Sequence, residues 1–95
     1  MNIINNGEKI YEIAAVEANK KYRISFELDG QLYFQIGVQK NDTIKRPVTK
    51  PLYGVTEKYT YVFSSRIDGM LCIEIIDSPS YNNWTAIHNI VVEEA

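Results

Sequence analysis

The stretch that decides the fold is residues 22–38, which read YRISFELDGQLYFQIGV. Residues 22–28 alternate apolar side chains at even positions with polar side chains at odd positions, and residues 32–38 repeat the alternation. A period of two is typical of a β-strand with one face in the core and the other in solvent. The Asp29-Gly30 pair between the two runs favours a type I′ turn, so the stretch predicts a β-hairpin.

The second half of the chain repeats this arrangement. Two strand-like runs, YTYVF at 59–63 and MLCIEII at 70–76, flank the turn-forming pair Asp68-Gly69, so a second hairpin is predicted. The second of these runs is apolar at nearly every position, which indicates a strand covered on both faces. Further strands are predicted over 10–16 and 87–92.

Six to eight short strands predict one all-β domain over residues 1–95, an antiparallel β-sandwich of jelly-roll-like form. Segment 39–57 is a long connection with two prolines, in which Val48 and Leu52 allow a short edge strand. Segment 77–84 has the composition of a loop. The predicted core consists of the inward residues of the strands, which are Tyr22, Ile24, Phe26, Leu28, Phe34, Ile36, Tyr61, Phe63, Leu71, Ile73 and Ile75.

Composition narrows the possible partners and compartments. The net charge is −2 and 23% of the residues are charged, which argues against disorder and against a nucleic-acid partner. No stretch approaches the roughly 18 apolar residues of a membrane helix, so no membrane partner is expected. The N-terminus lacks the basic start and apolar run of a signal peptide. We therefore expect cytoplasmic synthesis without a signal peptide, with incorporation into a virion as one destination.

The sequence offers little for catalysis. His88 is the only histidine, and its place in the last strand predicts a buried, hydrogen-bonded side chain rather than a catalytic one. Cys72 is the only cysteine and lies in an apolar strand, so an inert thiol is expected. The aspartates fall at turns, which explains them as well as a structural calcium would. We expect no enzyme activity, no metal site and no cofactor.

Candidate contact residues lie mainly in the two long connections. Aromatic side chains outside the predicted core are suited to sugar stacking or to anchoring a protein interface, and nearby basic side chains suit the rim of an interface or an anionic partner. The predicted contact surface comprises Tyr33, Tyr53, Tyr81, Trp84, Lys45, Arg46 and Lys50. The alternative is that both connections merely close the ends of the sandwich, with Trp84 as a plug.

Several segments follow one another in an order known from a family of binding modules. The run VEANKKYRISF at 16–26 is followed by YFQIGV at 33–38, YTYVF at 59–63 and IHNIVV at 87–92. This order resembles the carbohydrate-binding modules with a jelly-roll, galactose-binding-like fold. The resemblance implies a β-sandwich that binds carbohydrate. The opening strands that complete the sugar-binding face of that family are reduced here, which favours a protein partner.

Three functions remain open at this point. The favoured one is a non-catalytic binding or assembly module, a structural or decoration subunit of a larger particle such as a virion, with a protein partner or further copies of itself. The second is a free-standing carbohydrate-binding module. The third is a small enzyme with a site that the sequence does not reveal.

Overall fold

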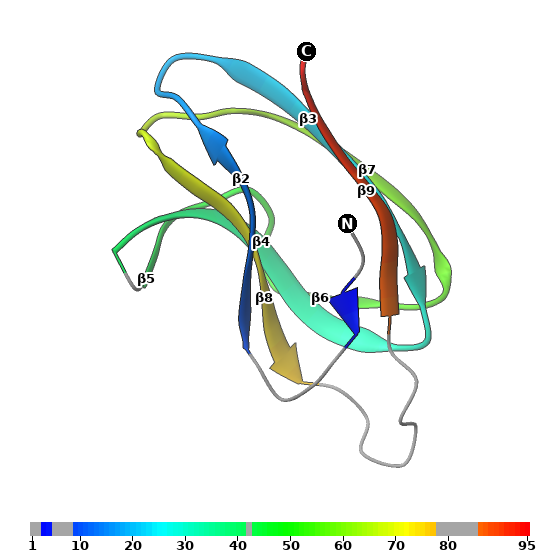
Figure 1. The fold of residues 1–95 in the computed structure, drawn as a ribbon. Helices are drawn as coiled ribbons and strands as arrows, with labels where there is room; N and C mark the ends of the chain where they lie inside the picture. The colour runs from blue at the N-terminus through cyan, green and yellow to red at the C-terminus, as the bar shows by residue number, and fades with distance from the viewer. Residues whose placement is uncertain (1–2, 5–8, 42, 78–85) are drawn as a thin grey trace.

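The computed structural model describes residues 3–4, 9–41, 43–77 and 86–95, which form nine β-strands (Figure 1). The strand predicted over 10–16 is present with those bounds, and the last strand is longer than predicted at both ends. No helix among these residues is long and apolar enough to cross a membrane. The strands are β1 (Ile3–Ile4), β2 (Ile10–Val16), β3 (Lys21–Asp29), β4 (Leu32–Lys40), β5 (Thr43–Pro47), β6 (Leu52–Gly54), β7 (Glu57–Ser64), β8 (Gly69–Asp77) and β9 (Ala86–Glu94).

The strands form two antiparallel sheets, which confirms the predicted β-sandwich. Sheet A has the order β1-β9-β3-β7, and sheet B has the order β2-β8-β4-β5, with β6 also paired to β4. Figure 1 shows β3, β7 and β9 on one side and β2, β4 and β8 on the other. From β1 to β4 and from β7 to β9, successive strands alternate between the sheets, as in a jelly roll.

Both predicted hairpins are wrong. β3 belongs to sheet A and β4 to sheet B, so the chain crosses the sandwich after Asp29-Gly30 instead of turning back within one sheet. The same holds for β7 and β8, which flank Asp68-Gly69. Gly30 does have a turn conformation, with a φ of 104°. Both connections are therefore arches between the two sheets.

The parity of the apolar residues explains the arches. A two-residue hairpin at Asp29-Gly30 would place Phe26 opposite Tyr33, and directly opposite residues share a face of the sheet. Phe26 belongs to the apolar side of its strand, whereas Tyr33 belongs to the polar side of the next strand. A hairpin would therefore direct the apolar sides of the two strands to opposite faces of the sheet. An arch removes the conflict because each strand directs its apolar side into the space between the sheets. A two-residue hairpin at Asp68-Gly69 would produce the same conflict between the strands on either side of it, and an arch removes the conflict there as well.

The core lies between the sheets and contains most of the predicted residues. Tyr61 and Phe63 are only partly buried, because β7 is an edge strand of sheet A. Leu32, Val38 and Ile87 are almost fully buried additions to the predicted set. The predicted residues that are buried are Tyr22, Ile24, Phe26, Leu28, Phe34, Ile36, Leu71, Ile73 and Ile75.

β8 is covered on both faces, as its sequence predicts. Leu71, Cys72 and Ile73 follow one another with no exposed surface. β8 lies between β2 and β4, and Gln39 Nε2 of β4 donates to Glu12 Oε1 of β2 at 3.3 Å, so these two side chains meet over the outer face of β8. A central strand with such a cover can carry consecutive apolar residues.

The connection 39–57 contains two strands rather than one. β5 and β6 both pair with β4, and β6 includes the residue Leu52 for which a short edge strand was expected. Gly54 ends β6 directly over the core. A Cβ atom at this position would lie 2.8 Å from Phe34 Cε1 and 2.9 Å from Leu28 Cδ2, so only glycine allows β6 to pack this closely.

Candidate contact surface

The structure separates the residues of the predicted contact surface. Tyr33 lies in β4, Tyr53 in β6 and Arg46 in β5, whereas Lys50 is exposed in the connection between β5 and β6. Tyr81 and Trp84 lie outside the described residues, and so does the side chain of Lys45. Tyr33 and Tyr53 come together, but Arg46 lies elsewhere.

Tyr33 and Tyr53 form an aromatic pair on the outer face of sheet B. The two residues are paired directly between β4 and β6, and their ring centroids are 6.3 Å apart with an interplanar angle of 46°. Tyr33 points outward because its neighbours Leu32 and Phe34 are both buried in the core. Tyr53 is 57% exposed, and its hydroxyl donates to Gln31 Oε1 at 3.2 Å. The pair is thus held in place while one ring remains open to a partner.

Two aliphatic residues extend this apolar area across sheet B. Ile76 is 39% exposed and lies in a bulge of β8, between the residues that pair with Tyr33 and Phe34. Ile10 of β2 lines a shallow hollow with Ile76. We call the outer surface formed by Ile10, Tyr33, Tyr53 and Ile76 the tyrosine face. It spans four strands of sheet B.

Charges of both signs border the tyrosine face. Lys9 and Glu74 line the same hollow as Ile10, and Asp77 is paired with Tyr33. Lys50 follows Thr49, whose carbonyl accepts a hydrogen bond from Gln35 Nε2 at 3.3 Å on this side of the sheet. An apolar centre with a charged rim is the usual arrangement of a protein interface.

The outer face of sheet A is different, because several of its polar side chains pair with one another. Arg23 Nη1 lies 3.1 Å from Glu93 Oε1, and Asn89 donates to Glu27. Val62 and Val91 are each about half exposed, but β3 lies between their strands. This face therefore offers isolated apolar residues among polar ones, which is an ordinary solvated surface.

Arg46 faces a different part of the molecule. It is paired with the core residue Val38, so its side chain leaves β5 on the inner side of the sheet. There it lines an opening of about 330 Å³ at the open side of the sandwich, together with Arg66 from the arch after β7. Sequence reasoning did not single out Arg66, Ile10 or Ile76. For Ile76 the signal was present, since an apolar residue next to the inward Ile75 must point outward.

The prediction for His88 is wrong, and that for Cys72 is supported. His88 is not buried: its side chain is 39% exposed, with Nε2 3.9 Å from Asp29 Oδ2. It pairs with Glu27 on the outer side of sheet A, where a histidine meets solvent. Cys72 has no exposed surface, and burial, with a smaller contribution from the charge of Glu12, raises the pKa of its thiol to about 11. Such a thiol is a poor nucleophile at neutral pH.

Two of the turn aspartates, Asp29 and Asp68, have separate contacts, whereas Asp42 lies outside the described residues. Asp29 lies near His88, and Asp68 Oδ1 accepts a hydrogen bond from Ala18 N at 2.8 Å. Within the described ranges, no three His, Cys, Asp or Glu side chains are grouped so that they could hold a metal ion.

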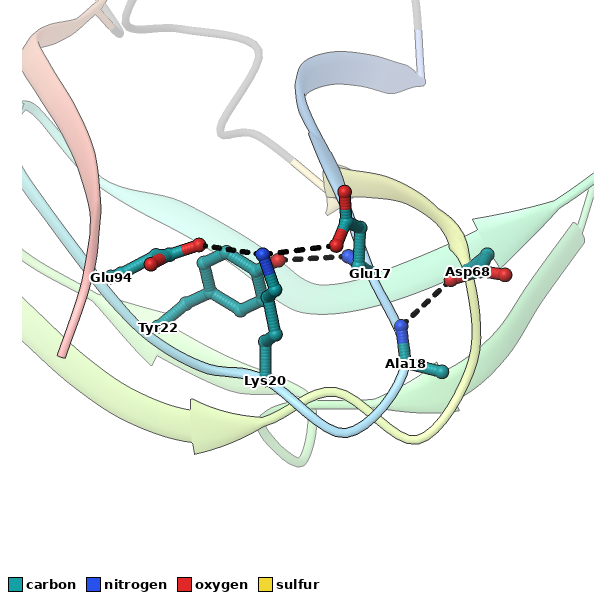
Figure 2. Close-up of polar contacts among 6 residues, drawn as sticks. All are labelled: Glu17, Ala18, Lys20, Tyr22, Asp68 and Glu94. Atoms are coloured by element: carbon teal, nitrogen blue, oxygen red, sulfur yellow. Dashed lines mark hydrogen bonds and ion pairs between the residues drawn. The ribbon is translucent and has the colours of Figure 1, made fainter.

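A cluster of polar contacts closes the end of the sandwich where β2 leads into β3 (Figure 2). Lys20 Nζ lies 3.0 Å from Glu17 Oε2 and 3.2 Å from Glu94 Oε1, and these hydrogen bonds and charges raise its pKa. The hydroxyl of Tyr22 accepts from Glu17 N at 2.8 Å. Figure 2 shows Lys20 between the two carboxylates, while Ala18 reaches Asp68 on the arch. The cluster joins three segments, and each of its charged side chains has a hydrogen-bond or ion-pair partner, so it is a structural closure.

Comparison with known proteins found no matching family model, no matching curated protein and no matching solved structure.

Proposed function

We propose that this chain is a non-catalytic assembly module, a structural subunit of a larger particle, and that it associates through the tyrosine face. The observation that carries the proposal is the exposed ring of Tyr53, which is held against Tyr33 at the edge of sheet B and continues the apolar area formed with Ile76 and Ile10. Tyrosine anchors of this kind are enriched at protein interfaces. A virion is one such particle, and this destination stays a prediction.

The occupant we propose for the tyrosine face is a second copy of the same chain. Its rim carries Lys9 and Lys50 as well as Glu74 and Asp77, so charges of both signs lie on one patch. In a two-fold contact the same patch is used twice, and a patch with both signs can be complementary to itself.

The aliphatic residues favour protein over carbohydrate at this face. A sugar that stacks on Tyr53 needs hydrogen-bonding groups for its hydroxyls. Gln31 and Asp77 lie beside the two rings, but Ile10 and Ile76, the rest of the tyrosine face, offer none. The groups most suited to catalysis also lie apart. Cys72 is buried in sheet B, and His88 is at the surface of sheet A.

The test is the oligomeric state of the chain and of matched variants by light scattering after size exclusion. Wild type is expected to be a dimer, and Tyr53→Ala and Ile76→Asp are expected to shift it to monomer. Val62→Asp places the same charge on the outer face of sheet A, at a site 49% exposed, and should leave the dimer intact. Circular dichroism and urea denaturation establish that each variant is folded.

Two results would replace the proposal. If wild type is monomeric and binds a defined glycan on an array, with binding lost in Tyr53→Ala, the tyrosine face is a carbohydrate site. If Val62→Asp dissociates the dimer as readily as Ile76→Asp, the contact does not lie on sheet B.

A further inference from the structure

The open side of the sandwich contains two arginines that no acidic group of the described residues neutralises. β5 and β7 are edge strands of opposite sheets, and the opening of about 330 Å³ is lined by residues at their ends and on the arch after β7. Val38, Val48 and Phe63 form its apolar part, and Arg46 and Arg66 contribute its charged groups. Its size is at the lower end of small-molecule sites, which are typically about 300–1,000 Å³.

Arg46 reaches this opening because of the register of β5. Directly opposite residues of an antiparallel pair share a face, and Arg46 is opposite Val38, which is 1% exposed. The side chain therefore leaves the strand on the side of the core, where an apolar residue would be expected. Its guanidinium stays partly in solvent, because β5 is at the edge of sheet B.

Arg66 reaches the same opening from the opposite sheet, on a well-fixed backbone. The preceding Ser65 is 3% exposed, its N donates to Lys20 O at 2.8 Å, and its carbonyl accepts from Asn19 N at 2.8 Å. The hydroxyl of Ser65 also donates to Ile67 O at 2.7 Å. These three hydrogen bonds place Arg66 without any contribution from its own side chain.

Neither guanidinium forms an ion pair with any residue that the structure describes. By contrast, Arg23 is paired with Glu93, and Lys20 with both Glu17 and Glu94. Asp68, the acid nearest to Arg66 along the chain, accepts a hydrogen bond from the backbone of Ala18. Two cations at one opening repel each other, and an anion between them relieves that repulsion.

We propose that this opening binds a small organic oxyanion, a phosphate or sulfate ester with an apolar group. The planar guanidinium groups of Arg46 and Arg66 donate to the anion oxygens from the two sheets. The apolar group of the ester packs on Val48 and Phe63. This site is separate from the tyrosine face, so it adds a ligand to the proposed assembly function and does not depend on it.

An inward-pointing charge on an edge strand has a second, purely structural explanation. Such charges prevent the edge from pairing with another chain. That purpose requires Arg46 alone and no ligand. It does not account for Arg66, which lies on an arch and has no free strand edge to protect.

The experiment is an NMR titration of the folded chain at low salt with phenyl phosphate and with phenyl sulfate. Inorganic phosphate and phenol serve as probes of the anion alone and of the ring alone. We expect saturable shifts at the amides of Val48 and Ser65 with a Kd of about 0.1–1 mM for one of the esters, and weaker binding of both reference probes. Whichever ester binds more tightly identifies the oxyanion.

Matched variants decide whether the two arginines form the site. Arg46→Gln and Arg66→Gln should each weaken the binding of the ester about tenfold or more, because each removes charge-assisted hydrogen bonds. Arg23→Gln makes the same change in net charge on sheet A and should leave the Kd unchanged. Absence of saturable shifts up to about 10 mM ester would overturn the proposal, since that limit is weaker than a charge-assisted site of this kind should show. Equal weakening by Arg23→Gln would also overturn it, by showing that only net charge matters.

Discussion

The hydroxyl of Tyr59 anchors the end of β6 through the backbone N–H and the backbone carbonyl of Val55. Its hydroxyl accepts a hydrogen bond from Val55 N at 3.0 Å and donates one to Val55 O at 2.9 Å. Its ring stacks on Phe26 with the centroids 5.6 Å apart, and it meets Phe34 edge-on at 5.9 Å. The variant Tyr59→Phe keeps the ring and removes only the hydroxyl, so it separates the hydrogen bonds from the packing.

We expect Tyr59→Phe to lower the free energy of unfolding by about 1–2 kcal/mol, since each of the two lost hydrogen bonds contributes about 0.5–1.5 kcal/mol. Each hydrogen bond is expected to contribute in the lower half of its range, because Val55 is 49% exposed and water can replace part of the lost hydrogen bonding. Urea denaturation followed by circular dichroism measures the change. The amide of Val55 should also exchange with solvent about 5–30-fold faster, which is the same free energy expressed as a ratio of populations.

Tyr61→Phe is the matched control. Tyr61 lies two residues along β7 on the same face, with its ring stacked on that of Tyr59 at 6.5 Å. Its hydroxyl makes no hydrogen bond with the described part of the chain, so its removal should change stability by less than about 0.5 kcal/mol. The reasoning fails if Tyr59→Phe costs less than about 0.5 kcal/mol or if both variants cost the same.

Two further predictions concern the core. Phe26→Ala should lower the free energy of unfolding by about 3–5 kcal/mol, because the ring is 1% exposed and packs on Phe34, Tyr59 and Tyr61. A loss below about 1 kcal/mol in urea, against Thr60→Ala as an exposed control, would contradict the assigned register. Burial raises the pKa of Cys72 from 9.0 to about 11, so the unfolded thiol ionises first and stability should fall as the pH rises from 9 to 11. Denaturation across this range should show a shallower fall in Cys72→Ala, and identical slopes would contradict a buried thiol.

The faces of the strands were predictable from the sequence, but the neighbours of the strands were not. Alternation assigns Phe26 and Phe34 to the interior and Tyr33 to the outside, because it depends only on the pleat of each strand. It does not say which strands are hydrogen-bonded, since pairing partners are chosen by the packing of the whole sandwich. The parity on both sides of Asp29-Gly30 did contain evidence against a two-residue hairpin, but the turn-forming pair suggested one.

The candidate surfaces depend on pairings that are distant in sequence, which is why they were only partly predictable. Tyr33 and Tyr53 meet because β6 pairs with β4 in a register that places them opposite each other. Arg46 was grouped with Tyr53 because both fall in the 39–57 connection. The register of β5 places the side chain of Arg46 on the inner side of the sheet, at the same opening as Arg66. Composition identified suitable residue types, but only the register shows which surface each one faces.

The segment from β5 to β6 contributes to both proposed sites, through strands that are held independently. β5 presents Arg46 and is fixed by its ladder with β4. β6 presents Tyr53 and is fixed by three pairs with β4 and by the hydroxyl of Tyr59 at its end. Tyr59→Phe should therefore loosen Tyr53 and weaken self-association, while the affinity for the ester stays within about twofold of wild type, as expected for distant and independent sites. If both affinities fall together, β5 and β6 move as one unit and the two sites are coupled through the connection between them.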